Sequence, residues 1–335
     1  MNRNRQTGPG RHRIGWSAAL GLLGYLLLLV AFWEAAHYFR LARPLRGHLF
    51  LPFLALAAML AVFWGFGWGL DAWLRRRLRL RLARLLVPGA FCLAVYALLS
   101  LPLDEFRLGF ALVYWALPTA LAALLLYLPP GDRFSWQDAV TLAALGLPIE
   151  YGWLRRALPQ PGLGDLPKFL LADLALYLYL IVRPLPGVGF DLRAHWSDFK
   201  NGVREWAWYT PIAIGLGFLL GFIRFHPVWP GFGRLAGAAL VTFLFVALPE
   251  ELFFRGLLQN LFATRLPPLR AQALAAAIFG LAHYVHGPVF NWRYVILAAI
   301  AGWFYGNAWR RQQRLAASAT THALVDVIWG AWFRK

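Results

Sequence analysis

The stretch LAGAALVTFLFVALPEELFFRGLLQNLFA, residues 235–263, is long and apolar enough to cross a bilayer as a single helix, since about 20 helical residues span the hydrocarbon core. Three ionisable side chains, Glu250, Glu251 and Arg255, lie near its middle. A charged group at mid-bilayer costs about 2.5–3.5 kcal/mol on insertion scales. We therefore expect all three to face the protein interior or a water-filled cavity.

The rest of the chain has the same apolar character. Of its 335 residues 60% are hydrophobic and only 14% are charged, whereas soluble domains carry about 25% charged residues. The composition predicts an all-α fold, a polytopic transmembrane helix bundle of about eight to eleven spans. The candidate spans are 15–37, 48–73, 86–103, 108–129, 138–154, 166–186, 207–224, 235–263, 269–287, 292–309 and 315–333. The fifth is short and contains Pro148 and Glu150, which favours a re-entrant or interfacial segment.

The net charge of +18 bears on partners and on topology. In a soluble protein this charge would indicate nucleic-acid binding. Here the arginines lie between apolar segments, where they set orientation and contact anionic lipid head groups, so we expect no nucleic-acid partner. With a cytoplasmic N-terminus, 20 lysines and arginines fall to the cytoplasmic side and 12 to the other. We predict an integral protein of the bacterial inner (cytoplasmic) membrane in that orientation.

The longest polar interruption covers residues 187–206, where Trp196 and Trp206 stand among charged residues as in an interfacial helix. We therefore predict an N-terminal membrane region over 1–190, whose function the sequence does not assign. An interfacial linker over 191–206 and a C-terminal membrane domain over 207–335 follow it.

Polar residues recur in the C-terminal helices at spacings that place them on shared faces. Glu251 and Arg255 are four residues apart, the spacing of a helical ion pair, whereas Glu250 lies about 100° further round the helix and stays available. A buried ion pair that locks helix packing explains Glu251 and Arg255 but not Glu250. His283 occupies the next apolar segment, and His322 and Asp326 share one face of the last. Such a set is typical of either a metal site or a general base with hydrogen-bond donors.

Three motifs carry a family resemblance: EELFFR at Glu250–Arg255, FGLAH at Phe279–His283 and HALVD at His322–Asp326. In order and spacing they resemble the EExxxR, FxxxH and HxxxN/D motifs of the CPBP family, also called Abi or CAAX-protease-like proteins. The resemblance covers roughly residues 207–335 and implies that the C-terminal helices form a CPBP-type catalytic core. It implies an intramembrane endopeptidase whose substrate is a membrane-embedded or lipid-anchored peptide or protein.

The resemblance also implies roles for the matching residues. Glu250 would activate a water molecule with help from His283, and His322 with Asp326 would stabilise the oxyanion. Three further residues, Glu251, Arg255 and Phe279, would orient these groups or hold the structure. Asp326 stands where the prenyl-protein proteases of the family carry Asn, and an ionised Asp cannot donate a hydrogen bond.

A zinc-dependent version of the same site is the alternative, with Glu250, His283 and His322 as ligands of an open His₂Glu centre. The chain lacks the HExxH zinc-protease motif, so we favour a glutamate mechanism without a cofactor. Two functions of other classes compete: a protease-like scaffold or bacteriocin-immunity protein without catalysis, and a proton-coupled transporter. The intact motifs argue against the scaffold. Confinement of the polar residues to the C-terminal half argues against the transporter.

Overall fold

Residues 11–38, 48–158, 166–285 and 291–333 are described by a computed structural model. The N-terminal part begins with α1 (Arg11–Tyr38), α2 (Phe50–Gly67), α3 (Leu70–Arg77), α4 (Arg81–Ser100), the 3₁₀ turn η1 (Leu101–Leu103) and α5 (Leu108–Tyr127). It continues with α6 (Trp136–Glu150), the 3₁₀ turn η2 (Trp153–Arg156), α7 (Leu166–Tyr177) and a π-helical extension, η3 (Leu178–Val182).

The C-terminal part begins with α8 (Trp196–Leu219). One continuous helix follows, made of α9 (Phe232–Thr242), η4 (Phe243–Ala247), α10 (Leu248–Glu251), η5 (Leu252–Gln259) and α11 (Asn260–Ala263). We call this helix of residues 232–263 the central helix. The chain ends with α12 (Pro268–Ala282), the 3₁₀ turn η6 (His283–Val285), α13 (Trp292–Gln312) and α14 (Leu315–Trp332).

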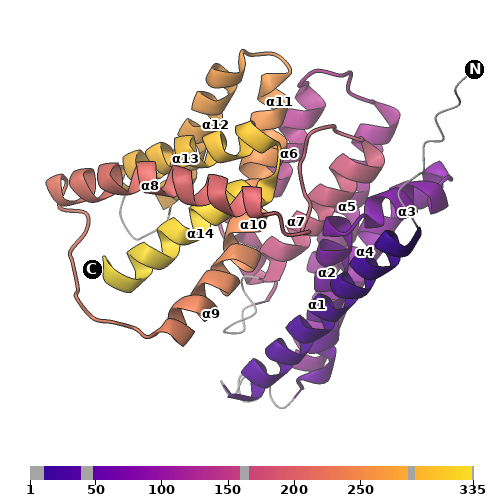
Figure 1. Ribbon diagram of the computed structural model, residues 1–335. Helices are drawn as coiled ribbons and strands as arrows, with labels where there is room; N and C mark the ends of the chain where they lie inside the picture. The colour runs from indigo at the N-terminus through magenta and orange to yellow at the C-terminus, as the bar shows by residue number, and fades with distance from the viewer. Residues whose placement is uncertain (1–10, 39–47, 159–165, 286–290, 334–335) are drawn as a thin grey trace, which may run out of the picture.

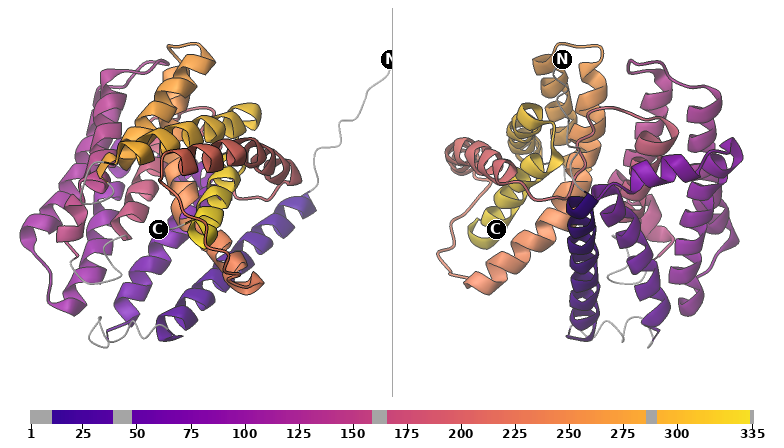
Figure 2. Two further views of the ribbon diagram at one scale, coloured as in Figure 1. Left: turned by 90° about the vertical axis from the view of Figure 1, so that its left-hand side faces the viewer. Right: turned by 45° about the vertical axis from the view of Figure 1, so that its right-hand side comes forward.

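All regular elements of the described residues are helical, so the all-α prediction is confirmed. Every apolar segment of the sequence falls on a helix, although Gly69, with φ of 95°, ends α2 and separates it from α3. In Figure 1 the helices α1–α5 lie to one side of the central helix and α8, α13 and α14 to the other, and the right-hand view of Figure 2 repeats this division. The central helix contacts α7 and, on the side of α8 and α13, it contacts α14.

Four helices of the described residues are long and apolar enough to cross a membrane: Phe50–Gly67, Arg81–Leu103, Leu108–Tyr127 and Phe232–Ala263. The protein is an integral membrane protein. The other described helices are shorter or less apolar than these four: α6, α7 and α12 have 12 to 15 residues, the apolar part of α1 covers Ala18–Glu34, and α8, α13 and α14 carry polar residues. The total of eight to eleven spans stays a prediction.

The region expected as an interfacial linker, residues 191–206, has no break at its C-terminal end. Helix α8 begins at Trp196 and continues to Leu219, so most of the expected linker and most of the seventh apolar segment form one helix. The separation of the chain at residues 190 and 207 stays a prediction. So does the orientation derived from the arginine count.

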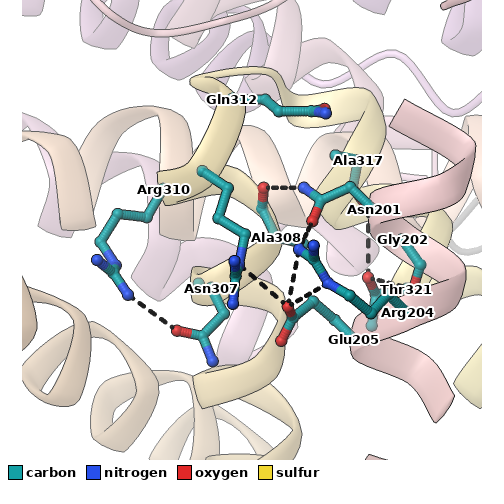
Figure 3. Close-up of polar contacts among 12 residues, drawn as sticks. Asn201, Gly202, Arg204, Glu205, Asn307, Ala308, Arg310, Gln312, Ala317 and Thr321 are labelled. Atoms are coloured by element: carbon teal, nitrogen blue, oxygen red, sulfur yellow. Dashed lines mark hydrogen bonds and ion pairs between the residues drawn. The ribbon is translucent and has the colours of Figure 1, made fainter. Parts of the chain in front are cut away.

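A polar cluster joins α8 to α13 and α14, and Figure 3 shows its contacts. Asn201 Nδ2 donates to the carbonyl oxygen of Ala308 at 2.7 Å, and Thr321 Oγ1 donates to that of Gly202 at 3.1 Å. A side chain at Gly202 would not fit, because its Cβ would lie 2.5 Å from Thr320 Cβ. The close approach therefore depends on glycine, and it fixes the rotation of α14 next to His322.

A second cluster ties the loop before α8 to the start of α14. Arg314 forms ion pairs with Asp191 at 2.9 Å and with Asp198 at 2.8 Å, and Leu315 N donates to the carbonyl oxygen of Gly189 at 2.9 Å. Partial burial by itself raises the pKa of Asp191, but hydrogen bonds from Arg193 and Arg314 outweigh burial and lower this pKa to about 2. The carboxylate is therefore bound in its charged form.

Candidate active site

The central helix departs from α-helical hydrogen bonding on both sides of Glu250 and Glu251. Residues Phe243–Ala247 and Leu252–Gln259 are π-helical, and Leu248 N donates to the carbonyl oxygen of Phe243, five residues earlier. Pro249 follows directly and has no N–H to continue the regular ladder. Single π-helical turns of this kind often mark functional sites. Here they flank the two carboxylates.

Glu251 is fully buried, and both of its carboxylate oxygens have protein partners. Its Oε1 accepts a hydrogen bond from Arg255 Nη1 at 2.9 Å and lies 2.8 Å from His322 Nδ1. An ionised carboxylate can only accept, so the hydrogen of this second bond sits on Nδ1 of the histidine. Glu251 thereby fixes the orientation of the His322 ring and directs Nε2 to the opposite side.

Arg255 and Ser318 complete the surroundings of Glu251. Arg255 is fully buried, donates from Nη2 to the carbonyl oxygen of Gly302 at 2.8 Å, and stacks 4.7 Å from the ring centre of Phe279. The Ser318 hydroxyl contacts Glu251 Oε2 and lies 2.9 Å from the carbonyl oxygen of Tyr305. The predicted pair of Glu251 and Arg255 is thus part of a larger buried network that holds His322.

Glu250 has different surroundings from its neighbour. Its side chain is 39% exposed, against 0% for Glu251. His322 Nε2 lies 3.8 Å from Glu250 Oε2 and 3.5 Å from Asp326 Oδ2, and the Asp326 side chain is 36% exposed. Two accessible carboxylates therefore flank the edge of the imidazole that Glu251 turns outward.

His283 lies at the end of α12, on the other side of Phe279. Its Nδ1 donates to the carbonyl oxygen of Phe279 at 2.8 Å, so that in the neutral ring Nε2 is the acceptor. The Phe279 ring lies 4.7 Å from the His283 ring and 5.7 Å from the His322 ring, measured between ring centres. Phe279, expected as an orienting residue, therefore contacts the rings of both histidines.

Two cavities meet at these side chains. The larger, of about 350 Å³, lies between the central helix and α6 and α7, and Glu250 and His283 line it. We call it the inter-region cavity. The smaller, of about 100 Å³, is lined by His283, His322 and Asp326 together with aromatic residues of α8, α13 and α14. His283 borders both cavities.

Within the described residues, no group of three or more His, Cys, Asp and Glu side chains is arranged to hold a metal ion. Both histidines bind protein partners through Nδ1 and leave Nε2 for other partners, as histidines that ligate a metal also do. The zinc alternative with Glu250, His283 and His322 as ligands stays a prediction. The structure brings Glu250, His322 and Asp326 to one edge.

Sequence reasoning missed two kinds of residue at the site. Ser318 precedes His322 by four residues on the same face of α14, and this spacing is a signal that was present in the sequence. Glu150 and Lys168 also line the inter-region cavity. No local pattern relates them to Glu250, because they come from α6 and from α7.

Comparison with protein families bears on the C-terminal part. Residues 232–328 match the family model described as "Type II CAAX prenyl endopeptidase Rce1-like". We call this matched region the Rce1-like domain. The recognised CPBP resemblance is thereby confirmed for the domain, which contains all seven of the expected site residues. Neither the search of curated proteins nor the search of solved structures found a match.

Proposed function

We propose that this protein is an intramembrane endopeptidase and that its Rce1-like domain is the catalytic core. The observation that carries the proposal is the contrast between two adjacent carboxylates. Glu251 is buried and bound to Arg255 and His322, whereas Glu250 opens onto a cavity beside the outward edge of His322. A held imidazole next to an accessible carboxylate can supply the oxyanion donor and the general base for hydrolysis of a peptide bond.

In the proposed reaction Glu250 is the general base. A water molecule in the inter-region cavity gives a proton to Glu250 as its oxygen attacks the scissile carbonyl carbon. His283 lines the same cavity and assists by positioning that water. A general base of this kind accelerates a reaction by about 10²–10⁴-fold.

The oxyanion then forms beside His322. Glu251 holds Nδ1–H, so a proton on Nε2 points toward Glu250 and Asp326 and can donate to the developing negative charge. Two flanking carboxylates favour a proton at that position. As the tetrahedral intermediate collapses, the C–N bond breaks and the proton held by Glu250 passes to the leaving amine, which leaves two peptide products.

The substrate in this proposal is a hydrophobic peptide segment or the end of a membrane-anchored protein. Both cavities are lined mainly by apolar and aromatic side chains, which suits chains delivered from the bilayer. We place the protein in a bacterial inner membrane with its N-terminus in the cytoplasm, on the strength of the arginine distribution. A reporter fused to each terminus tests the orientation.

The activity is tested with full-length protein in lipid nanodiscs. N-terminally acylated synthetic peptides of varied sequence are incubated in ¹⁸O-labelled water, and mass spectrometry follows the products. Hydrolysis places one labelled oxygen in each new carboxylate. We expect cleavage by the wild type, its persistence in a strong chelator, and a loss of about 10³-fold in Glu250→Gln.

The Glu250→Gln variant also provides the decisive control. Glu250 takes no part in the buried network, so the variant should melt at the wild-type temperature and still bind peptide. A fully active Glu250→Gln protein would remove Glu250 as the base. Peptide binding without cleavage by the wild type would instead favour the scaffold or immunity function. Loss of activity in chelator together with one bound zinc per chain would support the metal alternative.

A further inference from the structure

Helix α6, which lies outside the Rce1-like domain, runs antiparallel to the central helix. Directly before α6, Phe134 N donates to Thr264 Oγ1 at 2.8 Å, and the Phe134 ring centre lies 5.2 Å from that of Phe262. Further along α6, a Cβ added at Gly146 would lie 2.9 Å from Phe253 Cζ. As α6 proceeds, its contacts therefore move from the end of the central helix toward its middle.

The next turn of α6 brings a second carboxyl group level with Glu250. Glu150 follows Gly146 by four residues, which is about one helical turn. On the central helix Glu250 precedes Phe253 by three residues, and the antiparallel arrangement puts this turn opposite the one that carries Glu150. Both glutamates line the inter-region cavity, so the two carboxyl groups share one space from opposite walls.

The surroundings of the two carboxyl groups differ. His322 Nε2 lies 3.8 Å from Glu250 Oε2, whereas Glu150 Oε2 is buried and makes no hydrogen bond to the described residues. Lys168 also lines the cavity, but this residue is exposed, and solvent screens such a charge. An ionised carboxylate without a hydrogen bond is costly to bury, and two carboxylates that share an apolar site do not both ionise readily. These surroundings favour the proton on Glu150.

A base and a protonated acid on opposite walls of one cavity can act on two different atoms of a hydrolysis reaction. The base takes a proton from the attacking water, and the acid gives one to the nitrogen, which leaves poorly without it. Carboxyl pairs divide the reaction in this way in inverting glycosidases, where they stand about 6.5–9.5 Å apart so that a water molecule fits between them and the substrate. The cavity of about 350 Å³ has room for a peptide bond and for a water molecule, which occupies about 30 Å³ in the liquid.

We propose that Glu150 is a further catalytic residue, the general acid that protonates the leaving nitrogen across the cavity from Glu250. As the tetrahedral intermediate collapses, the C–N bond breaks and the Glu150 carboxyl gives its proton to the nitrogen. The proton that Glu250 took from water then passes through water in the cavity to the Glu150 carboxylate, so that both groups return to their starting states. This inference rests on the proposed function, and it places part of the catalytic machinery in the N-terminal region.

The test compares two acylated substrates of identical sequence, a peptide and its thioester analogue in which sulfur replaces the scissile N–H. A thiol has a pKa of about 8.5 and leaves as a thiolate, so its departure needs no acid, whereas water attack on either substrate needs Glu250. We expect Glu150→Gln to lower kcat about 10²-fold for the peptide and less than about tenfold for the thioester. Glu250→Gln should slow both alike. The matched control is Glu105→Gln, which changes a carboxylate of the N-terminal region outside the cavity and should leave both rates unchanged.

Unsubstituted protein provides a second measurement, which does not depend on the folding of a variant. The ratio of the two kcat values, peptide over thioester, cancels the titration of the other ionisable groups that line the cavity among the described residues, because these act on both substrates. They are Glu250, Lys168 and His283. The ratio should fall as the pH rises through the range of buried glutamates, up to about pH 9, because Glu150 then loses the proton that only the peptide needs.

The outcomes separate this inference from the proposed function. Equal slowing of both substrates in folded Glu150→Gln, no slowing of either, or a ratio that does not change with pH would overturn the role of Glu150 while Glu250 keeps its own. Cleavage of neither substrate by the wild type would overturn the proposed function and this inference together.

Discussion

The two sides of the central helix differ in how their charged side chains are surrounded. On the side of α13 and α14, Glu251 and Arg255 are fully buried and bound to His322, Ser318 and Gly302. On the side of α6 and α7, the chain leaves open a cavity of about 350 Å³. The first side satisfies nearly every polar group with protein partners, and the second leaves space for water and substrate.

Two adjacent carboxylates can lie on one membrane helix because each has a different environment. A buried ion pair is stable only when both charges are paired and hydrogen-bonded. The side of α13 and α14, which we call the closed side, meets that condition. The side of α6 and α7, which we call the open side, tolerates the charge of Glu250 because the cavity gives this carboxylate access to water. Glu250 and Glu251 are therefore expected to respond to substitution in opposite ways, one through activity and the other through stability.

Arg255→Ala is expected to lower the stability of the closed side more than any other substitution considered. It leaves Glu251 buried without its cation, and breaking such a pair lowers the free energy of unfolding by about 3–5 kcal/mol. Thermal unfolding in detergent measures the change. The matched control is Arg107→Ala, whose exposed pair with Glu105 should contribute less than about 1 kcal/mol. Equal stability losses in the two variants would show that the network around Glu251 is not a closed unit.

Ser318→Ala tests whether the hydroxyl belongs to that unit. The variant removes a donor from Glu251 Oε2 and leaves a buried acceptor, so stability should fall by about 1–3 kcal/mol. Because the same carboxylate orients His322, kcat should also fall while peptide binding is retained. Ser197→Ala, at an exposed serine of α8, is the control. Unchanged kcat in Ser318→Ala would separate the serine from the orientation of His322.

Asp326→Asn examines the open side beside His322. An amide accepts and donates, whereas an ionised carboxylate only accepts, so cleavage should stay within about tenfold of wild type, or about 1.4 kcal/mol, or exceed it. Asp326→Leu, which has similar size and no polar atom, should cleave more slowly. The measurements are kcat/KM and metal content. Loss of both zinc and activity in Asp326→Asn would contradict the metal-free proposal.

Asp191→Asn has the smallest expected effect on stability. It compares the buried pair of Glu251 and Arg255 with the partly solvent-screened pair of Asp191 and Arg314. The folded-state pKa of Asp191 is lowered to about 2, below the usual value of about 3.9. The carboxylate therefore stabilises the fold above about pH 4, by roughly 1 kcal/mol after screening, and this contribution disappears as the pH falls toward 2. The difference in melting temperature between wild type and variant should stay constant above about pH 5 and shrink as the pH falls from about 4 toward 2. A difference that does not shrink at low pH, or convergence in the exposed control Asp132→Asn as well, would contradict this assignment.

Part of the site was predictable from local spacing. Glu251 and Arg255 are four residues apart, as are His322 and Asp326, and both pairs lie in contact in the structure. The helical fold was predictable for the same reason, because apolar runs and i,i+4 spacing are properties of one segment at a time. The number of spans stays a prediction beyond the four long apolar helices, since hydropathy alone does not show where a helix ends or how polar a packed helix is.

The set of helices, the polar residues inside them and the family resemblance of residues 250–326 can therefore be read from the sequence. Which carboxylate is enclosed and which is accessible depends on the packing of the helices. The same packing brings Phe279 into contact with both histidine rings and places Glu150 and Lys168 in the cavity that Glu250 lines. The physical reason is that burial and cavity walls arise from contacts between helices far apart in the chain. Local periodicity fixes which face of a helix a residue occupies, and not which helix packs against that face.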